Sequence, residues 1–193
     1  EPQHTYVWKV RVWDEADQPS EWSRPAHWTQ APDWHARWIA ADATNEAAGT
    51  RPMPLFRKEF RAGRPVRRAL LYVSGLGQYE ARLNGRKVSD DELTPGWSDY
   101  HKTVFYDSYD VTAMVRKGAN ALGIMVGNGM YRVLKTPGRY TKFTGTFGPP
   151  KCVAQLDVEF ADGTRAEIVT DQTWKTHAGP ITFSSTYGGE DYD

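Results

Sequence analysis

The sequence has a single cysteine, no excess of charge of either sign and no long apolar run. Cys152 alone excludes an intramolecular disulfide and a cysteine-based zinc site. The 24 Lys and Arg residues equal the 24 Asp and Glu residues, so the basic surplus of a nucleic-acid binder is missing. No apolar stretch approaches the roughly 18 residues of a membrane helix. We therefore expect neither a nucleic-acid nor a membrane partner.

The chain opens on Glu1 and carries no signal peptide, so localisation is not fixed by a targeting segment. Its first residues, EPQHTYVWKV, are typical of the interior of a longer protein, and we expect an interior start. Cys152 lies in the apolar run CVAQLDVEF, which indicates a small side chain filling the core rather than a reactive thiol.

Aromatic residues make up 13% of the chain, with eight Trp, and hydrophobic residues 39%, enough for a packed core. Alternating or continuous apolar patterns predict short strands. These lie at residues 5–14, 21–30, 54–62, 67–75, 78–88, 102–111, 121–129, 151–164 and 165–176. Asn84-Gly85 predicts a type I′ hairpin turn. Between these strands, Asp110 or Thr112 is a candidate cap for one helical turn that ends at Gly118.

No strand–helix–strand alternation is present, which disfavours a parallel α/β sheet. The pattern predicts an all-β fold, an antiparallel jelly-roll-type sandwich of galactose-binding-like form. Residues 31–54 have low periodicity and are interpreted as a linker, with Trp34 and Trp38 as anchors. Two strands cannot bury a face alone, so the first thirty residues are either the tail of a truncated domain or an extension docked on the next one.

Three motifs are open to a catalytic or cofactor interpretation. The segment GLGQYE begins like a dinucleotide fingerprint, but Glu80 replaces the third glycine and a strand follows, so we reject it. Ser98, Asp99 and His101 are adjacent, but on a strand neighbours face opposite sides, which disfavours a triad. The acids of residues 90–92 are interpreted as turn residues; a carboxylate pair for glycosidic acid/base chemistry, here or at Asp99, is the alternative.

Aromatic side chains near polar turns are the stronger functional signal. Trp97, Tyr100 and Tyr131 lie in or beside turns, close in sequence to amides such as Asn128. A sugar requires an apolar face for stacking and amides or carboxylates for its hydroxyl groups. Calcium is a further hypothesis, because Glu80 and nearby amides offer oxygen ligands, although no EF-hand spacing occurs.

Residues 71–132 closely resemble the N-terminal β-sandwich domain of bacterial α-L-rhamnosidases, glycoside hydrolase family 78. The matching segments are GLGQYEARLNG, LTPGWSDY, YDVT, KGAN, GNGMY and the terminal YGGEDYD. The opening YVWKVRVWDEADQPSEWS resembles the last strands of a fibronectin type III-like domain. The resemblance thus implies two domains: the end of a fibronectin type III-like domain at residues 1–31, and the rhamnosidase β-sandwich at 32–193.

The resemblance implies that the parent protein hydrolyses terminal α-L-rhamnosides of plant or microbial glycans by an inverting mechanism. Its catalytic (α/α)6 barrel would follow residue 193, so this segment would carry no catalytic residues. A periplasmic or extracellular location is implied as well. The expected partners are a rhamnosyl glycan and the downstream catalytic domain of the same protein.

In some members of this family the sandwich is a calcium-dependent rhamnose-binding module of carbohydrate-binding family 67. Carried onto this sequence, the predicted ligand-binding residues are Glu80, Asn84, Trp97, Asn128 and Tyr131. Calcium is the implied cofactor, with Glu80 and Asn128 as ligands. The chain departs from the family at Met130, where Trp is usual. The alternative is therefore a purely structural domain that braces the catalytic barrel without binding sugar.

Overall fold

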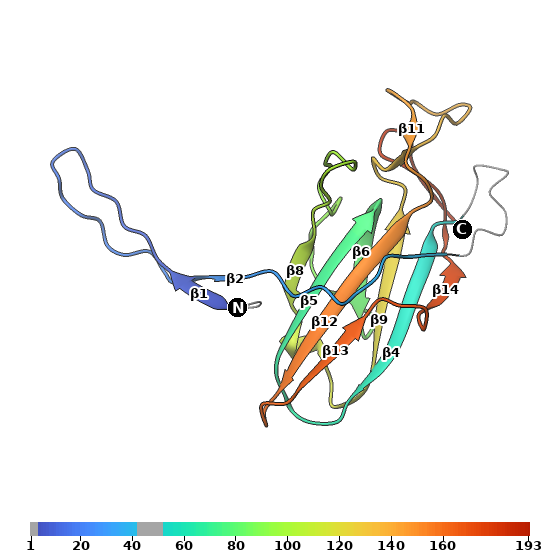
Figure 1. Ribbon diagram of the computed structural model, residues 1–193. Helices are drawn as coiled ribbons and strands as arrows, with labels where there is room; N and C mark the ends of the chain where they lie inside the picture. Colours follow the sequence, from blue (N-terminus) through green and yellow to red (C-terminus); the bar gives the residue numbers. More distant parts are fainter. Residues whose placement is uncertain (1–3, 42–51) are drawn as a thin grey trace. The chain divides into compact units, whose positions relative to one another are not determined.

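The computed structural model describes residues 4–41 and 52–193 (Figure 1). Within those ranges the regular elements are antiparallel strands, apart from one 3-10 turn, η2 at Thr112–Met114. No helix of the described residues has the length and apolar character needed to cross a membrane. The chain separates into two compact units, Glu1–Trp34 and His35–Asp193, which are described in turn.

The first unit is an antiparallel hairpin of β1 (Thr5–Trp8) and β2 (Ala26–Thr29). Both strands are shorter than the sequence predicts. Beyond them, the hydroxyl groups of Ser23 and Ser20 accept hydrogen bonds from Val10 and Val12, taking the place of backbone carbonyls in a regular ladder. Pro25, which lacks an amide hydrogen, stands directly before β2. The serine acceptors and Pro25 thus end the regular hydrogen-bond ladder, although the apolar alternation of the sequence continues.

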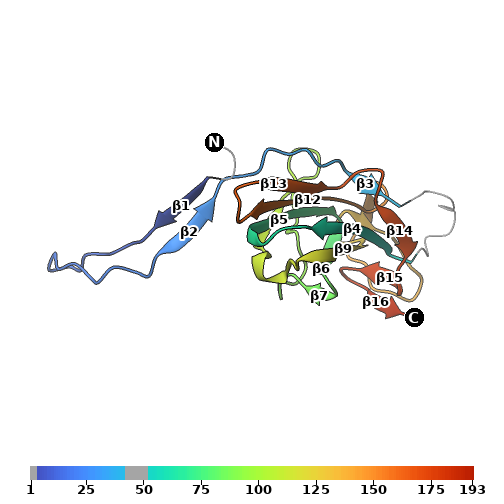
Figure 2. The ribbon, with the colours of Figure 1, turned by 90° about the horizontal axis from the view of Figure 1, so that it is seen from below.

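The second unit is a sandwich of two five-stranded sheets, seen as facing layers in Figure 2. One sheet has the order β13-β12-β5-β8, with β3 also paired to β12: β3 Ile39–Ala40, β5 Val66–Leu76, β8 Asp107–Asp110, β12 Lys151–Phe160 and β13 Arg165–Val169. The other has the order β14-β4-β9-β6-β7: β4 Pro54–Ala62, β6 Gln78–Leu83, β7 Arg86–Lys87, β9 Gly118–Gly127 and β14 Lys175–Ala178. Two small hairpins accompany them: β10 Arg132–Val133 with β11 Gly145–Thr146, and β15 Ile181–Ser185 with β16 Gly189–Tyr192.

The core lies between the two sheets and follows the period of two in the sequence. On β9, Leu122, Ile124 and Val126 are buried, while the residues between them face outward. Each such buried side chain contributes about 1.5–3 kcal/mol to folding. Cys152 is fully buried in the same core, as predicted, and burial raises the pKa of its thiol well above the ordinary value. The predicted all-β sandwich is confirmed.

The predicted hairpin at Asn84-Gly85 is confirmed. Both residues have positive φ, 53° and 82°, as a type I′ turn requires. Gly77, which begins the path into β6, has φ 124°, and a Cβ there would lie 2.1 Å from the carbonyl oxygen of Gly127. The GLGQYE segment is therefore a tight crossing between two sheets, built on glycine, and it leads into a strand rather than a helix.

Three predicted elements differ from the observed ones. Strand β8 begins only at Asp107, because the amides of Lys102 and Thr103 both bond to the carbonyl of Asp99 and form a turn. The predicted last strand is split into β13 and β14, which belong to different sheets, at a turn where the Asp171 carboxylate accepts from Thr173. The predicted linker contains β3, and its residues 42–51 lie outside the described part of the chain.

The helical turn is present as η2, but its cap and end differ from the prediction: Val111 is at the N-cap without a side-chain capping bond, and the turn ends at Met114, before Gly118. The amide of Thr112 donates to Asp110 Oδ1 at 3.0 Å. The η2 turn lies between β8 and β9, on the same side of the sandwich as the β6–β7 turn. We name this side the hairpin end, made of residues 84–85 and 111–118. The opposite side, at the top of Figure 1, is the loop end, made of residues 94–106, 128–150 and 181–192.

Candidate functional site

The two predicted asparagines lie at opposite ends of the sandwich. Asn84 follows Leu83 at the hairpin end, whereas Asn128 follows β9 at the loop end. Strand register places Gln78 opposite Gly127, and Leu83 lies five residues further along β6. At about 3.3 Å per residue, the two ends are about 16 Å apart. The structure therefore does not bring Asn84 and Asn128 to one monosaccharide.

Asn84 uses its whole side chain within the domain. Its Nδ2 donates to the carbonyl of Met114 and to Oδ1 of Asn120, both at 2.9 Å, and its Oδ1 accepts from the amide of Ala121 at 3.0 Å. These contacts tie the β6–β7 turn to the end of η2 and to β9. In the described arrangement Asn84 has a structural role that the Asn-Gly motif alone did not reveal.

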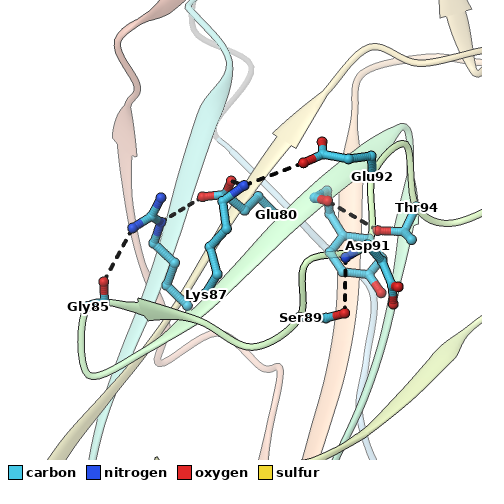
Figure 3. Close-up of polar contacts among 9 residues, drawn as sticks. Glu80, Gly85, Lys87, Ser89, Asp91, Glu92 and Thr94 are labelled. Carbon is cyan, nitrogen blue, oxygen red and sulfur yellow. Dashed lines mark hydrogen bonds and ion pairs between the residues drawn. The ribbon is translucent and has the colours of Figure 1, made fainter.

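Glu80 lies on the outward face of β6 and is held by two cations (Figure 3). Its Oε1 is 2.6 Å from Arg82 Nε, and its Oε2 is 2.7 Å from Lys87 Nζ. Burial raises the pKa of the Glu80 carboxyl, but the hydrogen bonds from Lys87 and Arg82 outweigh it, so the pKa lies below its ordinary value. Glu80 is therefore an ionised member of a charged cluster.

A calcium ion at Glu80 would have to displace both of these cations. Glu80 is opposite Met125, and Asn128 lies three residues further along, about 10 Å at the rise of a strand. Among residues 4–41 and 52–193, no group of three or more His, Cys, Asp or Glu side chains is arranged to hold a metal. As they lie, Glu80 and Asn128 do not converge on one ion, and calcium binding stays a prediction.

Trp97 is at the loop end and presents most of its ring to solvent, with 63% of its surface exposed. It stacks on Phe143, with ring centroids 6.1 Å apart and planes at 26°. Phe143, itself 39% exposed, has an edge contact with Tyr187 at 5.5 Å. Phe143, from the long segment between β10 and β11, thus supports the Trp97 ring, and Tyr187 of the β15–β16 hairpin supports Phe143 in turn.

Tyr131 lies beneath a second group of rings at the same end. Only 5% of its surface is exposed, and its hydroxyl donates to the carbonyl of Phe147 at 2.9 Å. It stacks on Phe147 at 5.6 Å and meets the edge of Tyr100 at 5.2 Å. Burial raises the pKa of both tyrosines. Tyr131 therefore holds the loop end together from below rather than offering a free face.

Asn128 precedes Tyr131 by three residues and is buried, with 6% of its surface exposed. Its Nδ2 donates to the carbonyl of Ser184 at 2.9 Å, which connects the end of β9 to β15. Its Oδ1 is buried and accepts no hydrogen bond from any described residue. Asn128 is thus a predicted ligand residue whose acceptor has no partner among the described residues but is not exposed at the surface.

Sequence reasoning missed Phe143, Tyr187 and Arg139. The guanidinium of Arg139 binds both oxygens of Asp191 at 2.6 Å and lies 4.7 Å from the ring centroid of Phe183. It fixes the segment before β11 to the β15–β16 hairpin. These residues lie in segments without strand or helix periodicity. The signal that could have indicated this region was its aromatic content, with Tyr140, Phe143 and Phe147 within eight residues.

The acidic and triad-like motifs form turn contacts. Ser89 Oγ accepts from the amide of Asp91 at 3.1 Å (Figure 3). Asp99 accepts from the amide of His101 at 3.1 Å, and Ser98 donates to the carbonyl of Thr103 at 2.6 Å. The Ser98 hydroxyl is therefore directed to the backbone and not to a base. The interpretation of these residues as turn residues agrees with their contacts.

Residues 64–193, two thirds of the chain, match the family described as the alpha-L-rhamnosidase N-terminal domain. The chain belongs to this family. Residues 1–32 match a second family, described as the Rha78A-like N-terminal immunoglobulin domain. The predicted fibronectin type III-like character of the first strands, and the predicted boundary between residues 31 and 32, stay predictions.

Curated relatives are named alpha-L-rhamnosidase. One from Streptomyces avermitilis is 40% identical over 201 residues, covering 95% of this chain and 18% of the relative. One from Formosa agariphila is 35% identical over 215 residues, covering 97% of this chain and 22% of the relative. This rhamnosidase N-terminal segment therefore spans about a fifth of the length of the curated relatives it matches.

Solved structures agree with this membership. The alpha-L-rhamnosidase from Dictyoglumus thermophilum superposes on the whole chain with a TM-score of 0.80 and 37% identity, over 22% of its own length. The Aspergillus terreus enzyme gives a TM-score of 0.84 and 33% identity, over 23% of its length. The rhamnosidase N-terminal sandwich is thus shown by sequence and by structure.

Proposed function

We propose that the chain is a non-catalytic accessory domain of an α-L-rhamnosidase, and that its loop end binds a rhamnosyl glycan. Membership in the rhamnosidase family supports the first part, together with relatives that are about five times longer. The parent protein would hydrolyse terminal α-L-rhamnosides of plant or microbial glycans outside the cell membrane, in the periplasm or beyond. Catalysis would reside in a barrel domain that follows residue 193.

The stacked, exposed pair of Trp97 and Phe143 is the observation that carries the sugar-binding proposal. An aromatic face offers the apolar surface on which the C–H groups of a sugar ring pack. The contacts of Phe143 and Tyr187 hold the Trp97 ring in place before a ligand arrives, which lowers the entropic cost of binding. Asn128, at the same end, holds the β15–β16 hairpin through its hydrogen bond to Ser184, and Tyr131 supports the loops from beneath.

Calorimetric titration with L-rhamnose tests this proposal. We expect saturable heat at millimolar sugar, abolished by Trp97→Ala. The matched control is Trp38→Ala, which removes another exposed Trp outside the loop end. Absence of heat in the unmodified protein, with calcium present, would contradict sugar binding. A second titration after chelation tests calcium separately: unchanged heat would exclude a calcium requirement while leaving the sugar site intact.

The second candidate is a structural domain that braces the catalytic barrel. It is favoured by the internal engagement of Asn84 and Glu80, two residues that the family resemblance assigned to ligands. The test is to prepare the complete parent enzyme with Trp97→Ala and to follow its thermal unfolding. A bracing role predicts a lower midpoint for the catalytic domain in the absence of sugar. A sugar-binding role predicts an unchanged midpoint and weaker retention on an immobilised rhamnosyl glycan.

A further inference from the structure

A trough runs along the outward face of the β14-β4-β9-β6-β7 sheet, away from the loop-end rings. Its floor is β9, where the outward residues Ala119 and Ala121 each carry a single side-chain carbon. One wall is β4, whose outward residues include Arg57 and Arg61. The long arginine side chains of β4 rise beside the small alanines of β9 and leave a depression in the face of the sheet.

Strand register places an arginine on each side of the next outward residue of β9, Gly123, beyond this floor. Gly123 is the Cα partner of Arg57 on β4 and of Arg82 on β6, so the two arginines flank one glycine. Two strand spacings separate them, about 10 Å. The depression holds about 480 Å³, within the range of about 300–1,000 Å³ typical of small-ligand sites.

Positive charge prevails on this face, although the whole chain is neutral. Arg57 pairs with Glu59 at 2.7 Å, and Arg82 pairs with Glu80 at 2.6 Å. Arg61, by contrast, has no ion pair with any described residue. The outward cations, taken from the strand pairings, are Arg57, Arg61, Arg82, Lys87 and Lys175, and the outward carboxylates of the same strands are Glu59 and Glu80.

We propose that this trough binds an acidic glycan, one whose sugar rings carry carboxylate groups. A guanidinium recognises a carboxylate through two parallel hydrogen bonds, and Arg61 is available for this contact. The small floor of Ala119 and Ala121 lets a sugar ring approach the sheet closely. The site lies on the sheet face and extends to Asn84 at the hairpin end, so it is separate from the loop-end site for rhamnose.

Titration of the full 193-residue chain with a hexameric oligogalacturonate tests the proposal, with a neutral maltohexaose as the paired ligand. We expect saturable binding of the acidic hexamer only, weakened by added salt. Arg61→Gln should weaken it about fivefold or more. Ala121→Leu fills the floor without changing charge and should weaken it by a similar factor. The matched control is Arg165→Gln, an exposed arginine of β13 in the other sheet, which should change affinity less than twofold.

Binding of maltohexaose as tightly as of the acidic hexamer would overturn the proposal, and so would equal loss in Arg61→Gln and Arg165→Gln. Equal binding of a linear polyphosphate of similar charge, insensitive to Ala121→Leu, would show a general anion surface and would overturn the assignment to a glycan. The L-rhamnose titration of Trp97→Ala addresses the other end of the domain. Failure at the trough and failure at the loop end are therefore distinguishable.

Discussion

The hairpin end and the loop end of the sandwich differ in how their side chains are used: those of the hairpin end bond within the domain, and those of the loop end include exposed rings. At the hairpin end, one short turn and one 3-10 turn close the sheet, and the amide of Asn84 is consumed by three internal hydrogen bonds. At the loop end, long irregular segments meet through aromatic rings, and Trp97 stays exposed. The recognisable Asn84-Gly85 motif therefore stabilises the fold, whereas the candidate binding surface is built from loop segments without periodicity.

Among the residues of the two ends, removing Asn84 should lower stability most. Asn84→Ala deletes three hydrogen bonds and forces Ala into a left-handed conformation at φ 53°. Together these should lower the free energy of unfolding by about 3 kcal/mol, measured by urea denaturation. Asn84→Gly keeps the turn conformation and should lose about 1 kcal/mol less. A stable Asn84→Ala protein with lost sugar binding would reverse the assignment of roles to the two ends.

Asn128→Ala should have an intermediate effect. It removes the donor to Ser184 that connects β9 to β15, and we expect a loss of about 1.5 kcal/mol in the free energy of unfolding. The same denaturation experiment measures it. Hydrogen exchange should localise the loss to residues 181–192, the β15–β16 hairpin, and leave the hairpin end protected. A uniform loss of protection across both ends would contradict a local role.

Trp97→Ala should change stability by less than about 1 kcal/mol, because the ring is largely exposed and its stack on Phe143 is its main contact. Phe56→Ala provides the contrast, since Phe56 is fully buried and its removal should cost about 3–5 kcal/mol. Thermal denaturation of the two variants measures the difference. If Trp97→Ala unfolded the domain, its role would be structural and the loop end would lose its candidate ligand surface.

The smallest expected effect is a pH dependence at Glu80. Its pKa is lower in the folded state than in the unfolded chain, so its contribution is present above the unfolded pKa of about 4.3 and is lost as pH falls through the folded value. Glu80→Gln should therefore reduce stability at pH 7 by about 0.5 kcal/mol and have no effect near pH 2. Glu92→Gln is the control, since this carboxylate is 3.8 Å from Lys87 and highly exposed. Equal effects at both pH values would contradict the ion-pair explanation.

Much of the fold could be predicted from the sequence. Strands β4, β5, β9 and β12 were predicted close to their observed ends, because apolar period two and a continuous apolar run depend on local spacing alone. The split of residues 165–176 into β13 and β14 could not be predicted. It arises from a turn at Asp171 that sends the two strands to different sheets, and sheet membership is a tertiary property.

Residue types and their spacing were sufficient to predict the all-β class, the Asn84-Gly85 turn, the buried Cys152 and membership in the rhamnosidase N-terminal family. These depend on residue type and spacing, which are local. The folded arrangement was needed to show that Asn84 and Asn128 lie at opposite ends of an antiparallel strand pair, and that Glu80 is held by Lys87. Strands β6 and β9 are not joined by a single turn, so no turn geometry sets their register, and their pairing depends on how the whole sandwich packs.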